Sequence, residues 1–229
     1  ELNIEKMNVN AFGGNMSLMG RYSSANPEQP ALDFDLDLKQ ITFADIFAQV
    51  PSMQRFVPVF EKLAGRFNTK LSLSTLLQNN MMPVLVSVLS QGNFNAESVT
   101  LKEDVTALNE LINSLKIDKI KGVNLKEIAL AFKIRDGRLE TKPFDLRFRD
   151  YNLNLGGSTG LDQTIAYAGN VKLPDKLNLG RFQNVGFKIG GTFQKPKIEL
   201  DLKNTLNTLV EEQKQKALQK ADSVKTQVL

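Results

Sequence analysis

Strict alternation of apolar and polar residues is the feature that most constrains the fold of this chain. In the clearest segment, 32–38, every second residue is Leu or Phe and every residue between them is Asp. Side chains two apart along a strand lie on the same face, so this segment predicts a strand with one dry and one wet face. The same pattern recurs at 66–73, 128–134, 144–149, 165–173, 187–189 and 198–202. The chain is therefore expected to consist mainly of half-buried strands.

Turn residues indicate how these strands connect. Asp136-Gly137 supplies the two positive φ angles of a type I′ turn, which predicts a hairpin between the strands on either side. Looser turns are expected at 13–14, 150–152 and 161–164. A Gly also stands two residues after Leu18, Leu155 and Ile189. Glycine inside a strand marks a bend, a bulge or a close approach, so these positions predict a sheet that curls.

Helical spacing interrupts the strands in three places and recurs in the tail. Thr42 is expected to cap a short helix, Ser52 a second one that Pro58 splits, and the segment 103–115 forms an amphipathic helix. The tail 204–229 contains no Gly or Pro and would extend about 40 Å as one helix. We therefore expect two parts, a curved-sheet domain over 1–203 and a helical tail over 204–229.

Composition narrows the possible functions. The chain has no His and no Cys, which removes triads, zinc sites and thiol chemistry and makes an enzyme improbable. The 29 basic and 25 acidic residues are intermixed, so no nucleic-acid partner is expected. No apolar stretch approaches the roughly 20 residues of a membrane span. Because the chain starts at Glu1 in a strand pattern, we expect a piece of a longer protein whose membrane anchor lies elsewhere. No cofactor or metal is expected.

Three polar clusters in the sequence are candidate sites. The carboxylates of Asp33, Asp35 and Asp37 would suit a cation or acid–base chemistry, but alternation favours the solvated side of a strand. The glycine-rich segment 156–160 lacks the Lys and the helix of a phosphate-binding loop, so a bend between strands is favoured. Arg147 and Arg149 are weak candidates for lipid headgroup contact, and the alternative is again the wet face of a strand.

The apolar stripes are the strongest candidate for function. With about seven or eight strands each carrying a stripe, the apolar area exceeds what the few predicted helices can cover. A curved sheet would then leave a groove able to accept acyl chains. The candidate groove-lining residues are Phe34, Leu36, Leu71, Leu73, Leu130, Phe132, Phe144, Leu146 and Phe148.

Several short motifs follow one another along the chain. They are LDFDLDL at 32–38 followed by ITFADIF at 41–47, LAGRF at 63–67, NMMPVL at 80–85 before the loop with Gly92, IRDGRL at 134–139, LNLGG at 153–157 with Gly160, and GGTFQKP at 190–196. Their order resembles the C-terminal region of AsmA-like proteins, which are related to TamB and to β-groove, bridge-like lipid-transfer proteins. The motifs cover most of residues 7 to 203, and the tail lies outside the resemblance.

The resemblance implies a protein of a Gram-negative bacterium that faces the periplasm and is anchored in the inner membrane. It implies a role in outer-membrane biogenesis and lipid transport, without catalytic residues. The expected fold is α+β: a strongly curved, mainly antiparallel sheet forming a partial barrel or groove, with a few amphipathic helices and a long C-terminal helix. The expected partners are phospholipid or other lipid acyl chains. An alternative function is a periplasmic scaffold that binds envelope assembly proteins or further copies, and an Asp33/Asp35 enzyme ranks last.

Overall fold

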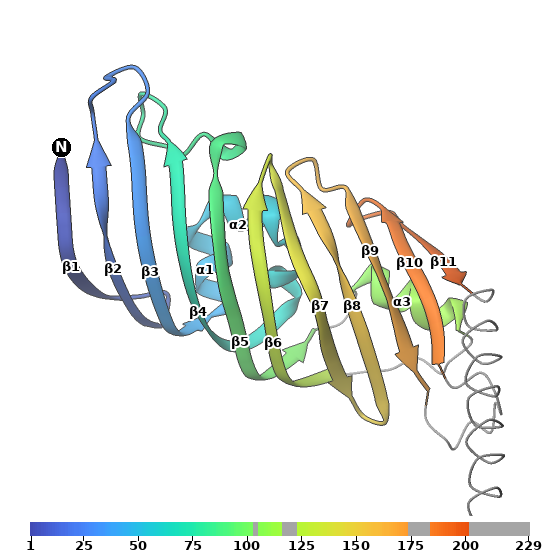
Figure 1. The fold of residues 1–229 in the computed structure, drawn as a ribbon. Coiled ribbons are helices and arrows are strands. Elements are labelled where there is room, and N and C mark those ends of the chain that lie inside the picture. The colour runs from blue at the N-terminus through green and yellow to red at the C-terminus, as the bar shows by residue number, and fades with distance from the viewer. Residues whose placement is uncertain (103–104, 116–122, 174–183, 202–229) are drawn as a thin grey trace, which may run out of the picture.

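One antiparallel sheet dominates the computed structural model, which describes residues 1–102, 105–115, 123–173 and 184–201. Its eleven strands lie side by side in chain order, each antiparallel to the next (Figure 1). The strands are β1 (Leu2–Ala11), β2 (Gly14–Ser23), β3 (Ala31–Thr42), β4 (Leu63–Leu76), β5 (Leu89–Leu101), β6 (Val123–Arg135), β7 (Arg138–Phe148), β8 (Tyr151–Gly160), β9 (Ile165–Lys172), β10 (Asn184–Gly191) and β11 (Pro196–Asp201).

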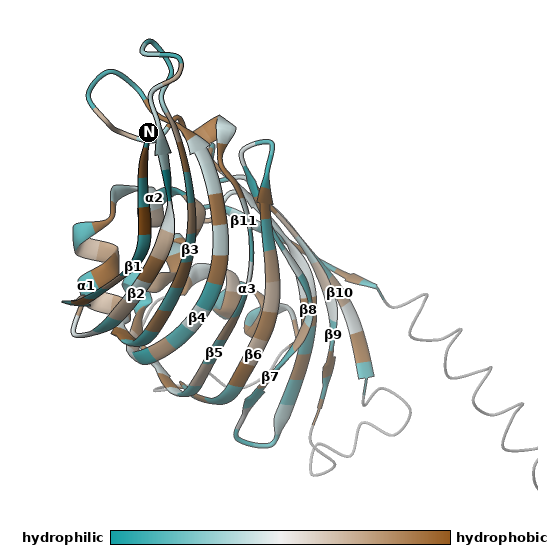
Figure 2. Cartoon of the chain, turned by 60° about the vertical axis from the view of Figure 1, so that its left-hand side comes forward, coloured by the Kyte–Doolittle hydropathy of each residue, from teal (hydrophilic) through white to brown (hydrophobic). Residues whose placement is uncertain are grey.

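The sheet bends around its helices and stays open. Figure 2 shows the strands curling so that the helices lie in the hollow of the sheet. The two outermost strands, β1 and β11, do not pair with each other in the described part of the chain. The expected curved, mainly antiparallel sheet is therefore confirmed, in the form of an open half-barrel.

The register explains why the sheet has two different faces. Cross-strand partners lie on the same face, and Leu36 pairs with Leu71 while Asp35 pairs with Ser72. Such rows continue from strand to strand, so the apolar residues of the alternating segments gather on the concave, inner face. The polar residues between them gather on the outer face.

Short helices cover part of the inner face. They are α1 (Phe43–Gln49), α2 (Pro51–Phe56), α3 (Thr106–Ser114) and two 3-10 turns, η1 (Pro58–Lys62) and η2 (Leu85–Ser87). Figure 1 shows α1 and α2 behind the middle strands and α3 behind the last ones. As expected, Thr42 caps α1, where its hydroxyl accepts a hydrogen bond from the Asp45 N–H at 3.1 Å.

The second helix differs from the expectation in one respect. It begins at Pro51, with Val50 as its N-cap and no capping hydrogen bond from a side chain, so the proposed Ser52 cap is wrong. Proline fits the first turn because its fixed φ suits the helix and its missing N–H has no partner there. The split at Pro58 is confirmed, since η1 starts at that residue.

Four phenylalanines form the centre of the core under α1. Phe43 is completely buried, and its ring lies 4.9 Å from that of Phe60 and 5.0 Å from that of Phe67. Phe94 stacks on Phe67 at 5.1 Å. These rings come from α1, η1, β4 and β5, so the cluster fixes the helical segment onto the sheet.

The predicted hairpin turn is confirmed. Arg135 pairs with Arg138, and the two residues between them, Asp136 and Gly137, have φ angles of 52° and 67°. The first hairpin has the same two-residue form at Phe12 and Gly13, one residue earlier than the expected turn at 13–14.

Aromatic rings lie over glycines of neighbouring strands. A Cβ at Gly157 would sit 2.7 Å from Cδ1 of Tyr167 and 2.2 Å from the carbonyl oxygen of Ala166. A Cβ at Gly92 would meet the Phe132 ring at 2.9 Å. Glycine is required at these positions because atoms of the neighbouring strands, backbone as well as ring, occupy the space that a side chain would take, which agrees with the expected close approach.

Two expectations extend beyond the described residues. The tail 204–229 and its predicted helix lie outside them, as does the boundary at residue 203. The start of the helix expected at 103 is also outside, although α3 confirms its central part. In the described part of the chain, no helix has both the length and the apolar character needed to cross a membrane.

Candidate functional site: an apolar cavity on the concave face

An apolar cavity of about 270 Å³ lies on the inner face of the sheet. Residues of α2, η1 and α3 line it on the helical side, and inward-facing residues of β4 to β10 form the sheet side. The lining residues are Phe56, Val57, Pro58, Val59, Phe60, Leu63, Phe94, Leu101, Val105, Ala107, Leu108, Leu111, Leu125, Ile128, Leu130, Phe144, Leu146, Leu153, Leu155, Thr159, Ile165, Tyr167, Ile189 and Phe193.

The wall of the cavity carries a single pair of polar groups among its described residues. Thr159 Oγ1 and Tyr167 Oη lie 3.0 Å apart and share a hydrogen bond. Burial raises the pKa of the Tyr167 hydroxyl above its usual value of 10.0, although the bond to Thr159 and the charge of Arg138 act in the opposite direction. The tyrosine therefore stays neutral and is able to donate a hydrogen bond.

The cavity is not a sealed packing defect. Leu130, Phe144, Leu146 and Leu155 line it, yet each remains half-buried rather than buried. Deeper residues of the same wall, such as Ile128 and Leu153, are only 6% and 5% exposed. The exposed apolar surface therefore faces the hollow between the helices and the sheet.

The structure separates the nine predicted groove residues into groups. Leu130, Phe144 and Leu146 line the apolar cavity. Leu36, Leu71 and Phe132 belong to one cross-strand row of the inner face outside the cavity.

Three predicted residues remain. Phe34 and Leu73 pair with each other further along the same face, where both are half-buried. The backbone of Phe148 pairs with Tyr151, and its side chain lies outside the described residues.

Sequence reasoning missed the helical half of the wall. Phe56, Phe60, Val105 and Leu108 belong to segments that the sequence predicts as helices, but strand alternation gives no reason to place them opposite the sheet's groove residues. The hydroxyl pair was also missed, because Thr159 and Tyr167 come from different strands. A signal was present: Tyr167 occupies an apolar position in an alternating segment and so places a hydroxyl on the inner face.

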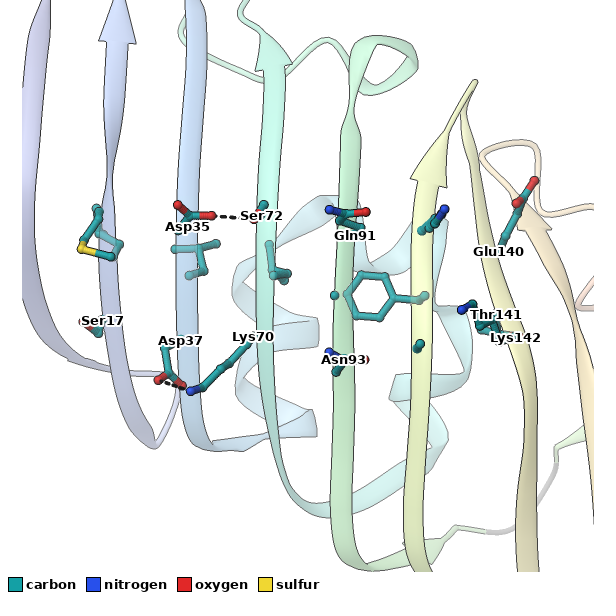
Figure 3. A pocket seen from close by; sticks show the side chains of 18 of the residues that line it. Ser17, Asp35, Asp37, Lys70, Ser72, Gln91, Asn93, Glu140, Thr141 and Lys142 are labelled. Atoms are coloured by element: carbon teal, nitrogen blue, oxygen red, sulfur yellow. Dashed lines mark hydrogen bonds and ion pairs between the residues drawn. The ribbon is translucent and has the colours of Figure 1, made fainter.

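A broad depression of about 850 Å³ spans β1 to β7, and polar side chains of the outer face line it together with Leu36, Leu71 and Phe132. Figure 3 shows two rows of its side chains, one with Asp35, Ser72 and Gln91, the other with Asp37, Lys70 and Asn93. Gln91 pairs across the sheet with Lys133, and Lys133 with Glu140, so the first row runs without a gap over the five strands β3 to β7.

The three aspartates of the first segment are all held by polar partners on this outer face. The pKa of Asp33 lies below its usual value because of hydrogen bonds from Ser74 and from Arg21, whose Nη2 is 3.1 Å away. Ser72 donates to Asp35 at 2.5 Å, and Lys70 Nζ lies 3.5 Å from Asp37. No group of three potential metal-binding side chains occurs among the described residues. These contacts are typical of the solvated side of a sheet.

The two candidate headgroup arginines lie away from the cavity. Arg147 pairs with Asn152 on the outer face, and its Nη1 is 3.8 Å from Glu127 Oε2. Arg149 belongs to the turn between β7 and β8, with a φ of 51°. The glycine-rich segment 156–160 lies within β8 and not in a phosphate-binding loop.

The described wall of the cavity is apolar, with the hydroxyl pair of Thr159 and Tyr167 as its polar feature. Comparison of the chain with protein-family models, with curated proteins and with solved structures finds no match.

Proposed function

We propose that the concave face binds lipid acyl chains and that this chain is a non-enzymatic module of the bacterial cell envelope. The observation that carries the proposal is the chemistry of the cavity wall. Among its described lining residues, Thr159 and Tyr167 alone bear a polar side-chain group. An acyl chain has no hydrogen-bonding groups along its length, so such a wall suits it.

The size of the cavity agrees with part of a lipid. An apolar cavity of roughly 150 Å³ is enough to hold a benzene molecule. At about 270 Å³, the present cavity has room for a segment of one acyl chain but not for a whole phospholipid. Each methylene moved from water into the cavity contributes about 0.8 kcal/mol to binding.

The inner face continues beyond the cavity as an apolar path. Leu36, Leu71 and Phe132 lie in one row, and Phe34 and Leu73 in the next, all of them half-buried. A lipid held in the cavity therefore has further apolar surface to lie on, which supports passage along the groove as well as shelter.

The resemblance to AsmA-like proteins indicates where in the cell such a module would work. Such a module would work in the periplasm, tethered to the inner membrane by a segment outside this chain, and would support outer-membrane assembly by sheltering or passing lipids. The proposal needs no metal, cofactor or catalytic group.

Binding of a fluorescent 16-carbon fatty acid to the full chain tests the proposal. Leu130→Gln places an amide in the wall, while Ala131→Gln places the same group on the outer face of the same strand. The proposal predicts saturable binding that Leu130→Gln weakens by at least about tenfold, the effect of roughly 1.4 kcal/mol. Ala131→Gln should leave it unchanged. Absence of saturable binding, or equal effects of both variants, would refute the proposal.

A further inference from the structure

The free edge of β1 has a symmetric sequence. Read outward from the bond between Glu5 and Lys6, the two halves of the strand match in chemical type. Glu5 corresponds to Lys6, Ile4 to Met7, Asn3 to Asn8 and Leu2 to Val9. Each apolar residue therefore has an apolar counterpart, each amide an amide, and each charge its opposite.

A β-bulge at the centre of β1 places the matching apolar residues of the two halves on the same face of the sheet. The register of β1 on β2 shifts between Ile4 and Met7, so that Ile4 pairs with Gly20 and Met7 with Leu18. Ile4 and Met7 are three positions apart, and in a regular strand they would face opposite sides of the sheet. The extra residue of the bulge places both on the inner face. The apolar residues Leu2, Ile4, Met7 and Val9 thus share one face on both sides of the centre.

The outer edge of β1 pairs with no strand in the described structure. β1 pairs with β2 on one side and with no described strand on the other, as Figure 1 shows at the blue end of the sheet. Leu2 and Met7 are 58% and 42% exposed, whereas Leu18, the partner of Met7 on β2, is 6% exposed. The apolar inner face therefore reaches the edge without being covered there.

We propose that β1 pairs with β1 of a second copy of this chain, antiparallel and around a two-fold axis between Glu5 and Lys6. In this register Glu5 faces Lys6 of the other copy twice, Ile4 faces Met7 and Leu2 faces Val9. Apolar pairs and opposite charges are the cross-strand combinations that stabilise antiparallel strands. Both concave faces then look to the same side, and the two sheets join into one.

The charges of Glu5 and Lys6 favour pairing with β1 of a second copy in this register. Charged residues and bulges on an edge normally discourage pairing with another strand. Here they favour one arrangement, because no other antiparallel register of two β1 strands places an opposite charge against both Glu5 and Lys6. Such a two-fold contact uses the same surface on both copies and closes after two chains.

Charge reversal tests the register. Glu5→Lys alone, or Lys6→Glu alone, puts like charges opposite each other twice in the dimer. The double variant Glu5→Lys/Lys6→Glu restores opposite charges, and so does an equimolar mixture of the two single variants. Sedimentation velocity should show a concentration-dependent dimer for the native chain, the double variant and the mixture. The dimer should be lost in each single variant.

Disulfide trapping in the cysteine-free chain gives a second measurement. An Asn3→Cys chain mixed with an Asn8→Cys chain should form a mixed disulfide, because positions 3 and 8 face each other. Asn3→Cys alone should not, since its two copies would lie five positions apart, about 17 Å, beyond the reach of a disulfide. A monomeric native chain at all concentrations, single variants that still dimerise, or equal cross-linking of Asn3→Cys alone would overturn the proposal. Any of these results would indicate that a strand of different sequence pairs with the edge of β1. None of them bears on lipid binding.

Discussion

Thr159 Oγ1 and Tyr167 Oη lie 3.0 Å apart in a cavity wall whose other described side chains are apolar. The two residues reach this position from adjacent strands, since Tyr167 pairs with Gly157, two residues before Thr159. The glycine leaves room for the ring, and the ring brings its hydroxyl to the threonine.

The losses of unfolding free energy caused by removing each hydroxyl should not add up when both hydroxyls are removed. Thr159→Val leaves the Tyr167 hydroxyl in an apolar wall without this partner, and an unsatisfied buried polar group costs about 1–3 kcal/mol. Thr159→Val/Tyr167→Phe removes both groups, so its loss should be smaller than the sum of the single losses. Urea unfolding of the four proteins of this cycle measures the coupling. Strict additivity would show that the hydrogen bond contributes nothing.

Alkaline stability should depend on Tyr167. Its pKa in the folded chain is raised, so between the ordinary value of 10.0 and the higher folded value the unfolded chain loses a proton that the folded chain keeps. Stability attributable to this group is therefore complete below pH 10 and falls as the pH rises above it. Tyr167→Phe should lose less stability between pH 9 and pH 11 than the native chain. Parallel denaturation curves for the two proteins would contradict this.

The aromatic cluster under α1 should be the most sensitive part of the core. Phe43 is fully buried and contacts the rings of Phe60, Phe67 and Phe94. Phe43→Ala should destabilise the fold by about 3–5 kcal/mol, because a cavity remains where the ring was. Val86→Ala is the control: that side chain is 68% exposed, and its loss should change stability by less than about 0.5 kcal/mol. Thermal unfolding measures the midpoint temperature of each variant. Equal decreases for Phe43→Ala and Val86→Ala would contradict the proposed core.

Two strand glycines should respond in opposite ways to alanine. At Gly157 a Cβ would lie 2.2 Å from the carbonyl oxygen of Ala166, so Gly157→Ala should cost about 1–3 kcal/mol through overpacking. At Gly190 nothing lies within 4 Å of the added carbon. Gly190→Ala should therefore be neutral or stabilise slightly, by up to about 1 kcal/mol, since it restricts the unfolded chain. Chemical denaturation checks both, and a tolerated Gly157→Ala would argue against the close approach.

Local patterns in the sequence were sufficient to predict much of the sheet. The alternation at 32–38 fixed the two faces of β3, and Asp136-Gly137 fixed one hairpin and its register. The first helix followed from the Thr42 cap. These features depend on residues close together in the chain, so a single sequence contains the information.

The shape of the site could not be predicted in the same way. Alternation showed that Leu36, Leu71 and Leu130 face inward, but not that Leu130 alone of these three lines the cavity. That distinction depends on where α2, η1 and α3 lie over the sheet, which long-range packing decides. The predicted Ser52 cap is wrong for a local reason, because the helix starts at Pro51, two residues earlier than a Ser52 cap would require.

Photo-crosslinking with a fatty acid that carries a diazirine near the end of its chain tests the central claim most directly. After irradiation and digestion, mass spectrometry locates the labelled residues. If acyl chains bind in the cavity, labels are expected on its wall, above all on residues 56–60 of the helical side and on Leu130, Phe144, Leu146 and Leu155 of the sheet. An excess of unlabelled fatty acid should remove them. Labels confined to the outer face, or labels that competition leaves unchanged, would contradict the account.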